Sequence, residues 1–365
     1  MISFQASISK GWLHDKGGFL FNEKYYMDPL YRRSQDKEMN DFIKEDYGNY
    51  PLYNMEANLM QADYISINQV LIGGIQPNLI LANMLGAEFV YYKDKDMDVS
   101  GNPLAHISTA DELPQIRQIQ EHPFIQQLDA QITNIMRDHP ELDIIPPFFW
   151  DSSGRATIHG IITTSLKLIG DKAMMMIIMN PDLLHTIHQW ITDAYNVLIN
   201  HYATLVNMRI TSVHVGECSG TMISNDQYLE FITPYINQLG DNFGKIRLHS
   251  CGPSDHILDA ISEIKNLSVI DTASNTSIAK IRDIMGIDFE INVEPPVNIM
   301  LDGSPEKDLI TWLDNTLAEN QGGPLKFVIH IESNYSTNNC LMIYDELLKR
   351  KLINPENRDY ISLII

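Results

Sequence analysis

The sequence predicts an α/β protein, a (β/α)8 TIM barrel with a helical N-terminal extension. Short β-rich apolar runs alternate with helical stretches from about residue 156 onward, and no Ser/Gly-rich linker divides them. The chain has 365 residues, 44% of them hydrophobic, which is enough for one large core. Because strands that alternate with helices this often must be parallel and joined by crossovers, an eight-stranded barrel explains the repeat best.

The N-terminal part differs from the rest of the chain. Residues 1–60 are rich in aromatic and charged side chains, with Tyr25, Tyr26 and Tyr31 set between short helical patterns. We expect them to form a helical extension packed on the barrel, and residues 61–365 to form the barrel itself. Its first strands are expected over residues 64–71 and 88–92.

Later strands and helices follow from hydrophobic periodicity and start signals. Strands are expected over residues 143–149, 209–215, 245–249, 268–271, 288–292 and 326–331. A long helix is expected over residues 182–206, because Asn180-Pro181 is a favourable helix start and apolar residues follow at helical spacing. Further helices are expected over residues 225–239, 254–264, 277–285, 305–318 and 338–351.

Composition excludes several classes of partner. The formal net charge is −21, from 47 acidic against 26 basic residues, which argues against binding to nucleic acid or to an anionic membrane surface. No apolar segment is long enough to span a membrane and the N-terminus has no secretory pattern, so we expect a cytoplasmic protein. Three cysteines make a disulfide framework improbable and leave free thiols. A homo-oligomer is compatible with the sequence.

Polar side chains end several predicted strands, where a barrel enzyme builds its active site. The strand ends carry Glu217 and Cys218, then His249 and Cys251, then Asp271, then Asn292 and Glu294, then His330 and Glu332.

Four of these residues form a candidate zinc site. Glu217, His249, Cys251 and His330 offer the mixed oxygen, nitrogen and sulfur donors of a tetrahedral site. In the alternative interpretation, Glu217 forms an ion pair, His249 bonds a backbone group and Cys251 is a small packing residue. Cys218 is either a spare ligand or a packing residue.

Cys340 is the competing fourth ligand. It lies ten residues beyond His330, where the last helix has already begun, and this placement favours His330.

Residues 146–352 resemble the uroporphyrinogen decarboxylase superfamily, and within it the corrinoid-dependent zinc thiol methyltransferases of the methylcobamide:coenzyme M methyltransferase type. The segments that carry the resemblance include ECSGTMISNDQYLEFITP from Glu217, HSCG from His249 and INVEPPVNIMLDGSP from Ile291. In that family an acidic residue, the His-x-Cys pair and a later cysteine surround the zinc. The position of the later cysteine is occupied here by His330, which would make the site less rich in thiolate.

The resemblance implies a methyl transfer between a corrinoid and a thiol. Zinc would hold a small thiol substrate as a thiolate, which would attack the methyl group of methylcobalamin. Glu217 and His249 would be catalytic, and Asp271 and Asn292 would contact the cofactor or substrate. The corrinoid would arrive on a partner protein, since the chain has no Asp-x-His-x-x-Gly segment.

Two other functions stay open. One is a decarboxylase-like enzyme that acts on a tetrapyrrole, although Arg32-Arg33 is the nearest basic pair and a polycarboxylate needs cationic partners. The other is a non-catalytic relative that binds a corrinoid or a partner protein.

Overall fold

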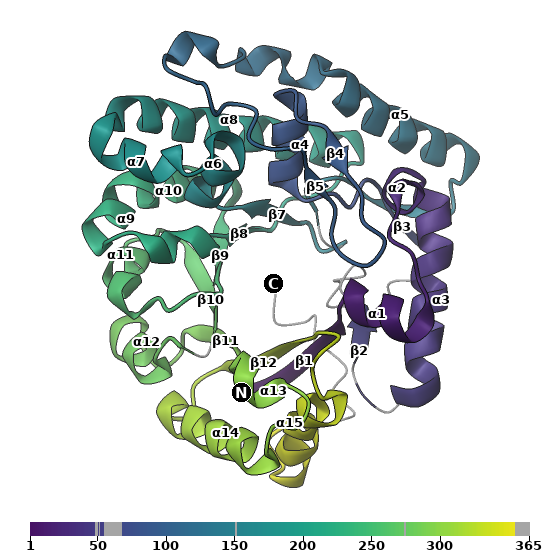
Figure 1. The fold of residues 1–365 in the computed structure, drawn as a ribbon, viewed down its shortest axis with the longest axis vertical. Coiled ribbons are helices and arrows are strands. Elements are labelled where there is room, and N and C mark those ends of the chain that lie inside the picture. Colours follow the sequence, from purple (N-terminus) through teal and green to yellow (C-terminus); the bar gives the residue numbers. More distant parts are fainter. Residues whose placement is uncertain (48–49, 51, 55–67, 150–151, 274, 355–365) are drawn as a thin grey trace.

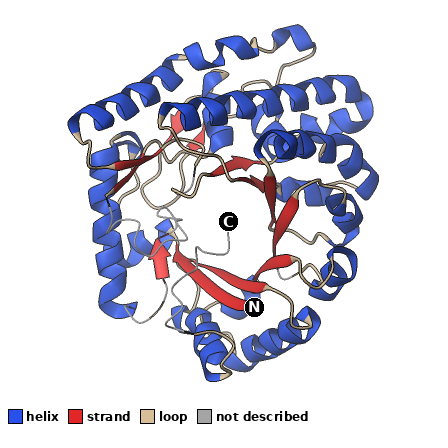
Figure 2. Cartoon of the chain, turned by 180° about the vertical axis from the view of Figure 1, so that it is seen from behind, coloured by secondary structure: helices blue, strands red, loops and turns tan. Residues whose placement is uncertain are grey.

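A parallel sheet of eight strands forms the centre of the molecule. The computed structural model describes residues 1–47, 50, 52–54, 68–149, 152–273 and 275–354. The strand order is β2-β1-β12-β11-β10-β9-β8-β7, and every pairing in the sheet is parallel. The sheet curls around a centre and helices lie outside it (Figures 1 and 2), which confirms the predicted barrel-like α/β class.

Six of these strands lie beyond residue 154. They are β7 (Arg155–His159), β8 (Ser212–Gly216), β9 (Lys245–Ser250), β10 (Leu267–Ala273), β11 (Glu290–Glu294) and β12 (Leu325–Ile331). Five match strands predicted from the sequence, and β7 was not predicted. The expected strand over residues 143–149 is shorter, because only β6 (Asp143–Ile145) is extended, and β6 pairs with β3 (Gln69–Leu71) in a separate sheet.

The first strand of the chain corrects the prediction of a helical extension over residues 1–60, because part of this segment is a strand of the main sheet. β1 (Ile2–Ile8) pairs with β12 along its whole length, from Ile2 against Leu325 to Ile8 against Ile331. Apolar Phe4, Ala6 and Ile8 alternate with polar residues and are fully buried, as a strand with one core face requires.

The rest of the N-terminal part is mainly helical. The helices are α1 (Lys10–Gly17), α2 (Glu23–Met27) and α3 (Pro29–Tyr47), and they are followed by the short strand β2 (Leu52–Asn54) at the edge of the sheet. The expected boundary at residue 60 lies outside the described residues.

The second expected barrel strand also needs correction. Only β4 (Phe89–Val90) forms within residues 88–92, and it pairs antiparallel with β5 (Asp98–Val99), apart from the main sheet. The earlier expected strand is present only as β3, since residues 64–67 lie outside the described residues. Helices α4 (Pro77–Met84) and α5 (Pro123–Asp138) complete this part.

Helices connect and follow the strands from β7 to β12. They are α6 (Ile161–Ile169), α7 (Lys172–Met179), α8 (Pro181–Leu205), α9 (Asn225–Phe231), α10 (Thr233–Phe243), α11 (Leu258–Ser262), α12 (Ile278–Met285), α13 (Val297–Met300), α14 (Glu306–Asn320) and α15 (Thr337–Lys349). The helix expected over residues 225–239 is two helices, because Pro234 has no N–H for a continuous ladder. The helix expected over residues 254–264 is only a 3-10 turn (Asp255–Ile257) and the short α11.

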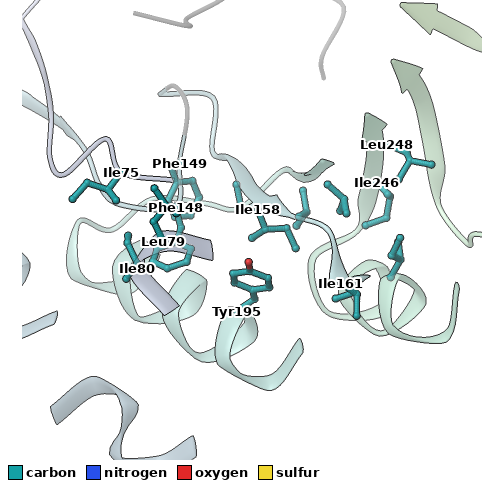
Figure 3. Packing of buried hydrophobic residues seen from close by; sticks show 14 of the residues in the cluster. Ile75, Leu79, Ile80, Phe148, Phe149, Ile158, Ile161, Tyr195, Ile246 and Leu248 are labelled. Carbon is teal, nitrogen blue, oxygen red and sulfur yellow. The ribbon is translucent and has the colours of Figure 1, made fainter. Parts of the chain in front are cut away.

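Strand alternation separates an apolar outer face from a polar inner face. Ile158, Ile246 and Leu248 face the helices, where they lie in one core with Tyr195 and Ile161 (Figure 3). The residues between them in sequence point into the space that the curled sheet encloses. Arg155, Arg247 and Lys326 are therefore buried inside it. No helix in the described part of the chain is both long and apolar enough to cross a membrane.

Candidate metal centre

Two thiols and one imidazole meet at the ends of two neighbouring strands. Cys218 begins a short 3-10 helix (Cys218–Met222) directly beyond Glu217, the residue that follows β8. His249 is near the end of β9, and Cys251 is the first residue after that strand. One ligand atom from each of the three lies within 4.8 Å of the others. The structure thus brings together the predicted pair His249 and Cys251, with Cys218 as the third member.

Asp271 holds the imidazole of His249 from the neighbouring strand. The two residues are register partners of β9 and β10, and His249 Nδ1 lies 3.1 Å from Asp271 Oδ2. Although burial opposes the charged form, Asp271 raises the pKa of His249 well above its usual value. A carboxylate on Nδ1 fixes the tautomer and leaves Nε2 available to a metal ion.

The two thiols have opposite protonation preferences. The Cys218 thiol and the His249 imidazole lower the pKa of Cys251 to about 4. The pKa of Cys218 is raised, chiefly by its contact with Cys251 and by burial. At neutral pH the pair therefore shares one proton, with the exposed Cys251 as the thiolate. A thiolate is the form that binds zinc.

Glu217 is not part of this group, because helix α6 binds its carboxylate. Glu217 Oε1 accepts hydrogen bonds from the backbone N–H of Thr163 at 3.0 Å and from its hydroxyl at 2.8 Å, and Oε2 accepts from Ile162 N at 3.3 Å. The side chain is 1% exposed. Burial raises the pKa of Glu217 to about 7, even though these hydrogen bonds favour the carboxylate.

A second group of donors shares His249. His249, Asp271 and Glu294 each offer a ligand atom within 4.8 Å of the others. Glu294 ends β11, and burial, together with the charge of Asp271, raises its pKa to about 7. The sequence shows Glu294 at a strand end, but we assigned it no role there.

His330 faces Glu294 rather than the two thiols. Its Nε2 lies 3.5 Å from Glu294 Oε1, and its Nδ1 lies 2.6 Å from the hydroxyl oxygen of Ser7 on β1. Burial lowers the pKa of His330, so the imidazole is neutral near pH 7. Neither group of donors described above includes this histidine.

Two other predicted residues have clear positions. Asn292 is 1% exposed on the inner face of β11, and both atoms of its amide lack a hydrogen-bond partner among the described residues. Cys340 is fully buried on α15, and burial raises the pKa of its thiol to about 12. Cys340 is therefore a core residue whose surroundings oppose the thiolate form.

A cavity of about 200 Å³ adjoins the inner face of β7. Apolar and polar residues both line it, and the polar ones include Tyr26, Arg32, Thr157 and His159. Burial, with a contribution from the charge of His249, lowers the pKa of His159 to about 4. His159 is thus a neutral imidazole in the wall of the cavity, and no sequence signal singles it out.

Comparison with known proteins agrees with this architecture. A solved structure described as a methyltransferase from Methanosarcina mazei has the same fold, with a TM-score of 0.58, 15% sequence identity and coverage of 94% of both chains. Among curated proteins, none matches the sequence. The family model described as uroporphyrinogen decarboxylase (URO-D) matches residues 78–328, well over half of the chain. This protein therefore belongs to the uroporphyrinogen decarboxylase family, as the resemblance in its sequence predicted.

Proposed function

We propose that this protein is a zinc-dependent methyltransferase that moves a methyl group between a corrinoid, carried by a partner protein, and a small thiol. The observation that carries the proposal is the group of Cys218, His249 and Cys251 with Asp271 behind it. The methyltransferase from Methanosarcina mazei supplies a precedent for a methyltransferase with this fold.

The donor set suits zinc. Two sulfurs and one imidazole nitrogen are ligands that zinc prefers, and three protein ligands leave the open fourth position of a catalytic site. The proposed set keeps the predicted His249 and Cys251 and adds Cys218. Glu217 and His330 are not in it, because α6 binds the first and Ser7 and Glu294 contact the second.

The residues around the site would prepare a thiol to accept a methyl group. Zinc, when bound, would hold the sulfur of the substrate as a thiolate at neutral pH, the nucleophile that methyl transfer requires. Asp271 keeps His249 in the tautomer that binds metal. Asn292, whose amide has no partner in the described part of the chain, and the neutral His159 would hydrogen-bond a substrate in the centre of the barrel. The cavity that His159 lines would hold the body of that substrate.

The first test is the metal content of purified protein, measured by mass spectrometry. We expect about one zinc per chain in the wild type, and loss of that zinc in Cys251→Ser and in Cys218→Ser. Cys340→Ser is the matched control, because it removes the one thiol that is remote from the site, and it should keep its zinc. Wild-type protein without zinc, or a Cys251→Ser variant with full zinc, would contradict the proposal.

The second test is methyl transfer from methylcobalamin to a panel of small thiols. Transfer by the wild type and not by Cys251→Ser is expected. A zinc-loaded protein that methylates no thiol would instead favour a tetrapyrrole decarboxylase or a non-catalytic binding protein.

A further inference from the structure

We infer that the substrate is an extended, uncharged thiol, whose sulfur lies at the metal-binding residues, whose chain crosses Gly216 and whose far end lies in the cavity beside β7. This inference rests on the proposed function, since it names the class of thiol that the same site would accept. It makes Gly216 a residue that determines specificity.

Gly216 leaves a gap between the cavity and the metal-binding residues. It is the register partner of His159 on β7 and of His249 on β9, so the three residues form one row across the sheet. Val215 belongs to the outer core, and Gly216 therefore faces inward. Two strand spacings, about 10 Å, separate the two histidines. Among the described residues, a Cβ at Gly216 would meet only the carbonyl oxygen of Ile158 within 4 Å, at 3.7 Å. The middle of the row is thus open to a substrate chain.

The cavity beyond this gap has the features of a binding site. Its lining includes Ile75, Phe148 and Phe149 (Figure 3), together with Thr157 and His159 from β7. His159 Nδ1 is buried and has no hydrogen-bond partner in the described part of the chain, so a ligand atom would supply one. Phe148 has a φ of 68°, a left-handed backbone that is strained for a bulky side chain, and such strain is concentrated at ligand sites. These walls suit a group that is partly apolar and accepts or donates a hydrogen bond.

The charges beside the cavity are already paired. Arg32 and Asp96 are the charged residues in its lining. Arg32 Nε lies 3.5 Å from Asp36 Oδ2, and both of these side chains are buried. Asp96 forms an ion pair with the buried Lys10. An ionic group on the substrate would have to break one of these pairs or stay without a partner, and both are costly in a buried site. An uncharged far end avoids this cost.

The volume of the cavity limits the size of that far end. At about 200 Å³ it is smaller than the roughly 300–1,000 Å³ of pockets for drug-sized ligands. It therefore suits the end of a small thiol and not a tetrapyrrole.

Two thiols of equal length test the charge of the substrate. 6-Mercaptohexan-1-ol and 6-mercaptohexanoate differ only at the far end, which is an alcohol in one and a carboxylate in the other. Binding of each to full-length, zinc-loaded protein is measured by calorimetry at pH 8. We expect the alcohol to bind at least about tenfold more tightly, because the carboxylate would be buried without a partner. Equal affinities, or a preference for the carboxylate, would overturn the inference.

Gly216→Val tests the path across the sheet. Its side chain would fill the gap, and one methylene of misfit in a pocket changes kcat/KM by roughly 10–200-fold. We expect kcat/KM for 6-mercaptohexan-1-ol, divided by that for the short 2-mercaptoethanol, to fall at least about tenfold in Gly216→Val and by a smaller factor in Gly216→Ala. Ala273→Val is the matched control, because it adds bulk at the end of β10, on the side of β9 away from the cavity. It should keep the wild-type ratio.

Circular dichroism checks that each variant is folded, and Gly216→Ala, whose added Cβ meets no close atom, carries the test if Gly216→Val does not fold. An unchanged ratio in the folded Gly216 variant, or an equal fall in Ala273→Val, would overturn the inference. If no thiol is methylated, the proposed function fails, and the calorimetric comparison still tests the preference for an uncharged thiol. The two failures are therefore distinguishable.

Discussion

Glu217 is a buried carboxyl whose ionisation opposes folding near neutral pH. Its pKa rises from 4.5 to about 7 in the folded protein, because burial outweighs the hydrogen bonds from α6. A group with a raised folded pKa contributes stability that is fully present below the unfolded value and is lost as the pH rises through the folded value. Glu217 should therefore stabilise the fold in acid and cost stability at pH 8.

Replacing Glu217 with glutamine should remove this pH dependence. The shift corresponds to about 3 kcal/mol in total, most of it between pH 5 and pH 8. Urea unfolding of metal-free protein at both pH values should show the wild type losing about that much stability relative to Glu217→Gln. The exposed Glu263→Gln is the control and should follow the wild type. Parallel profiles for wild type and Glu217→Gln would contradict the assignment of this pKa.

The His249–Cys251 pair could be predicted because its spacing is local. Residues two apart at a strand end point to the same side, so the sequence itself brings them together. Glu217 and Cys218 are adjacent in sequence, and which of them lies beside His249 and Cys251 depends on the path of the chain after β8. Glu294 was visible as a strand-end residue, but its distance from His249 depends on the register of three strands.

At the scale of elements, the junction of β7 with α6 places the Glu217 carboxylate. Gly160 lies between them, and a Cβ there would be 2.3 Å from the Glu217 carboxyl carbon and 2.7 Å from its Cα. The backbone of Gly160 is ordinary, with φ of −62°, so its requirement is steric. Only glycine lets the carboxylate reach the start of the helix.

Gly160→Ala should consequently destabilise the protein by about 1–3 kcal/mol, the usual cost of overpacking. Gly216→Ala is the matched control at the end of the neighbouring strand, since its nearest atom would be an ordinary 3.7 Å away. Urea unfolding of both variants measures the difference. Equal stability of the two would show that Glu217 does not pack against Gly160.

Element prediction succeeded where a periodic pattern was long and failed where local signals were weak. Helix α8 has 25 residues and a clear start at Pro181, and it lies where expected. Strand β1 was missed, although Phe4, Ala6 and Ile8 alternate with polar residues, because the aromatic and charged residues that follow suggested a helical segment. Short runs such as β7 carry too few residues to separate strand from loop.

For the whole molecule, the first strand joins the two ends of the described chain. β1 lies between β2 and β12, so residues near the N-terminus pack against the last helix, as Phe4 does against Tyr344 with ring centroids 5.3 Å apart. The inner face of the sheet depends on this strand as well, because it supplies Ser7 to His330.

Phe4→Ala should therefore cost about 3–5 kcal/mol, the range for a fully buried phenylalanine. Leu20→Ala, at a side chain that is 45% exposed, is the control and should change stability by less than about 0.5 kcal/mol. Both values come from urea unfolding followed by circular dichroism. A small effect of Phe4→Ala would show that β1 is peripheral to the fold.

The sequence alone determined the class of fold, the family and the His-x-Cys pair, because periodicity, repeated strand–helix order and short spacings are properties of neighbouring residues. Tertiary structure decided the rest of the candidate site. It brought Cys218 to the pair, bound Glu217 to α6, and set Glu294 beside His249 and His330. These relations join residues far apart in the chain, and they follow from strand register and from the packing of helix starts against strand ends.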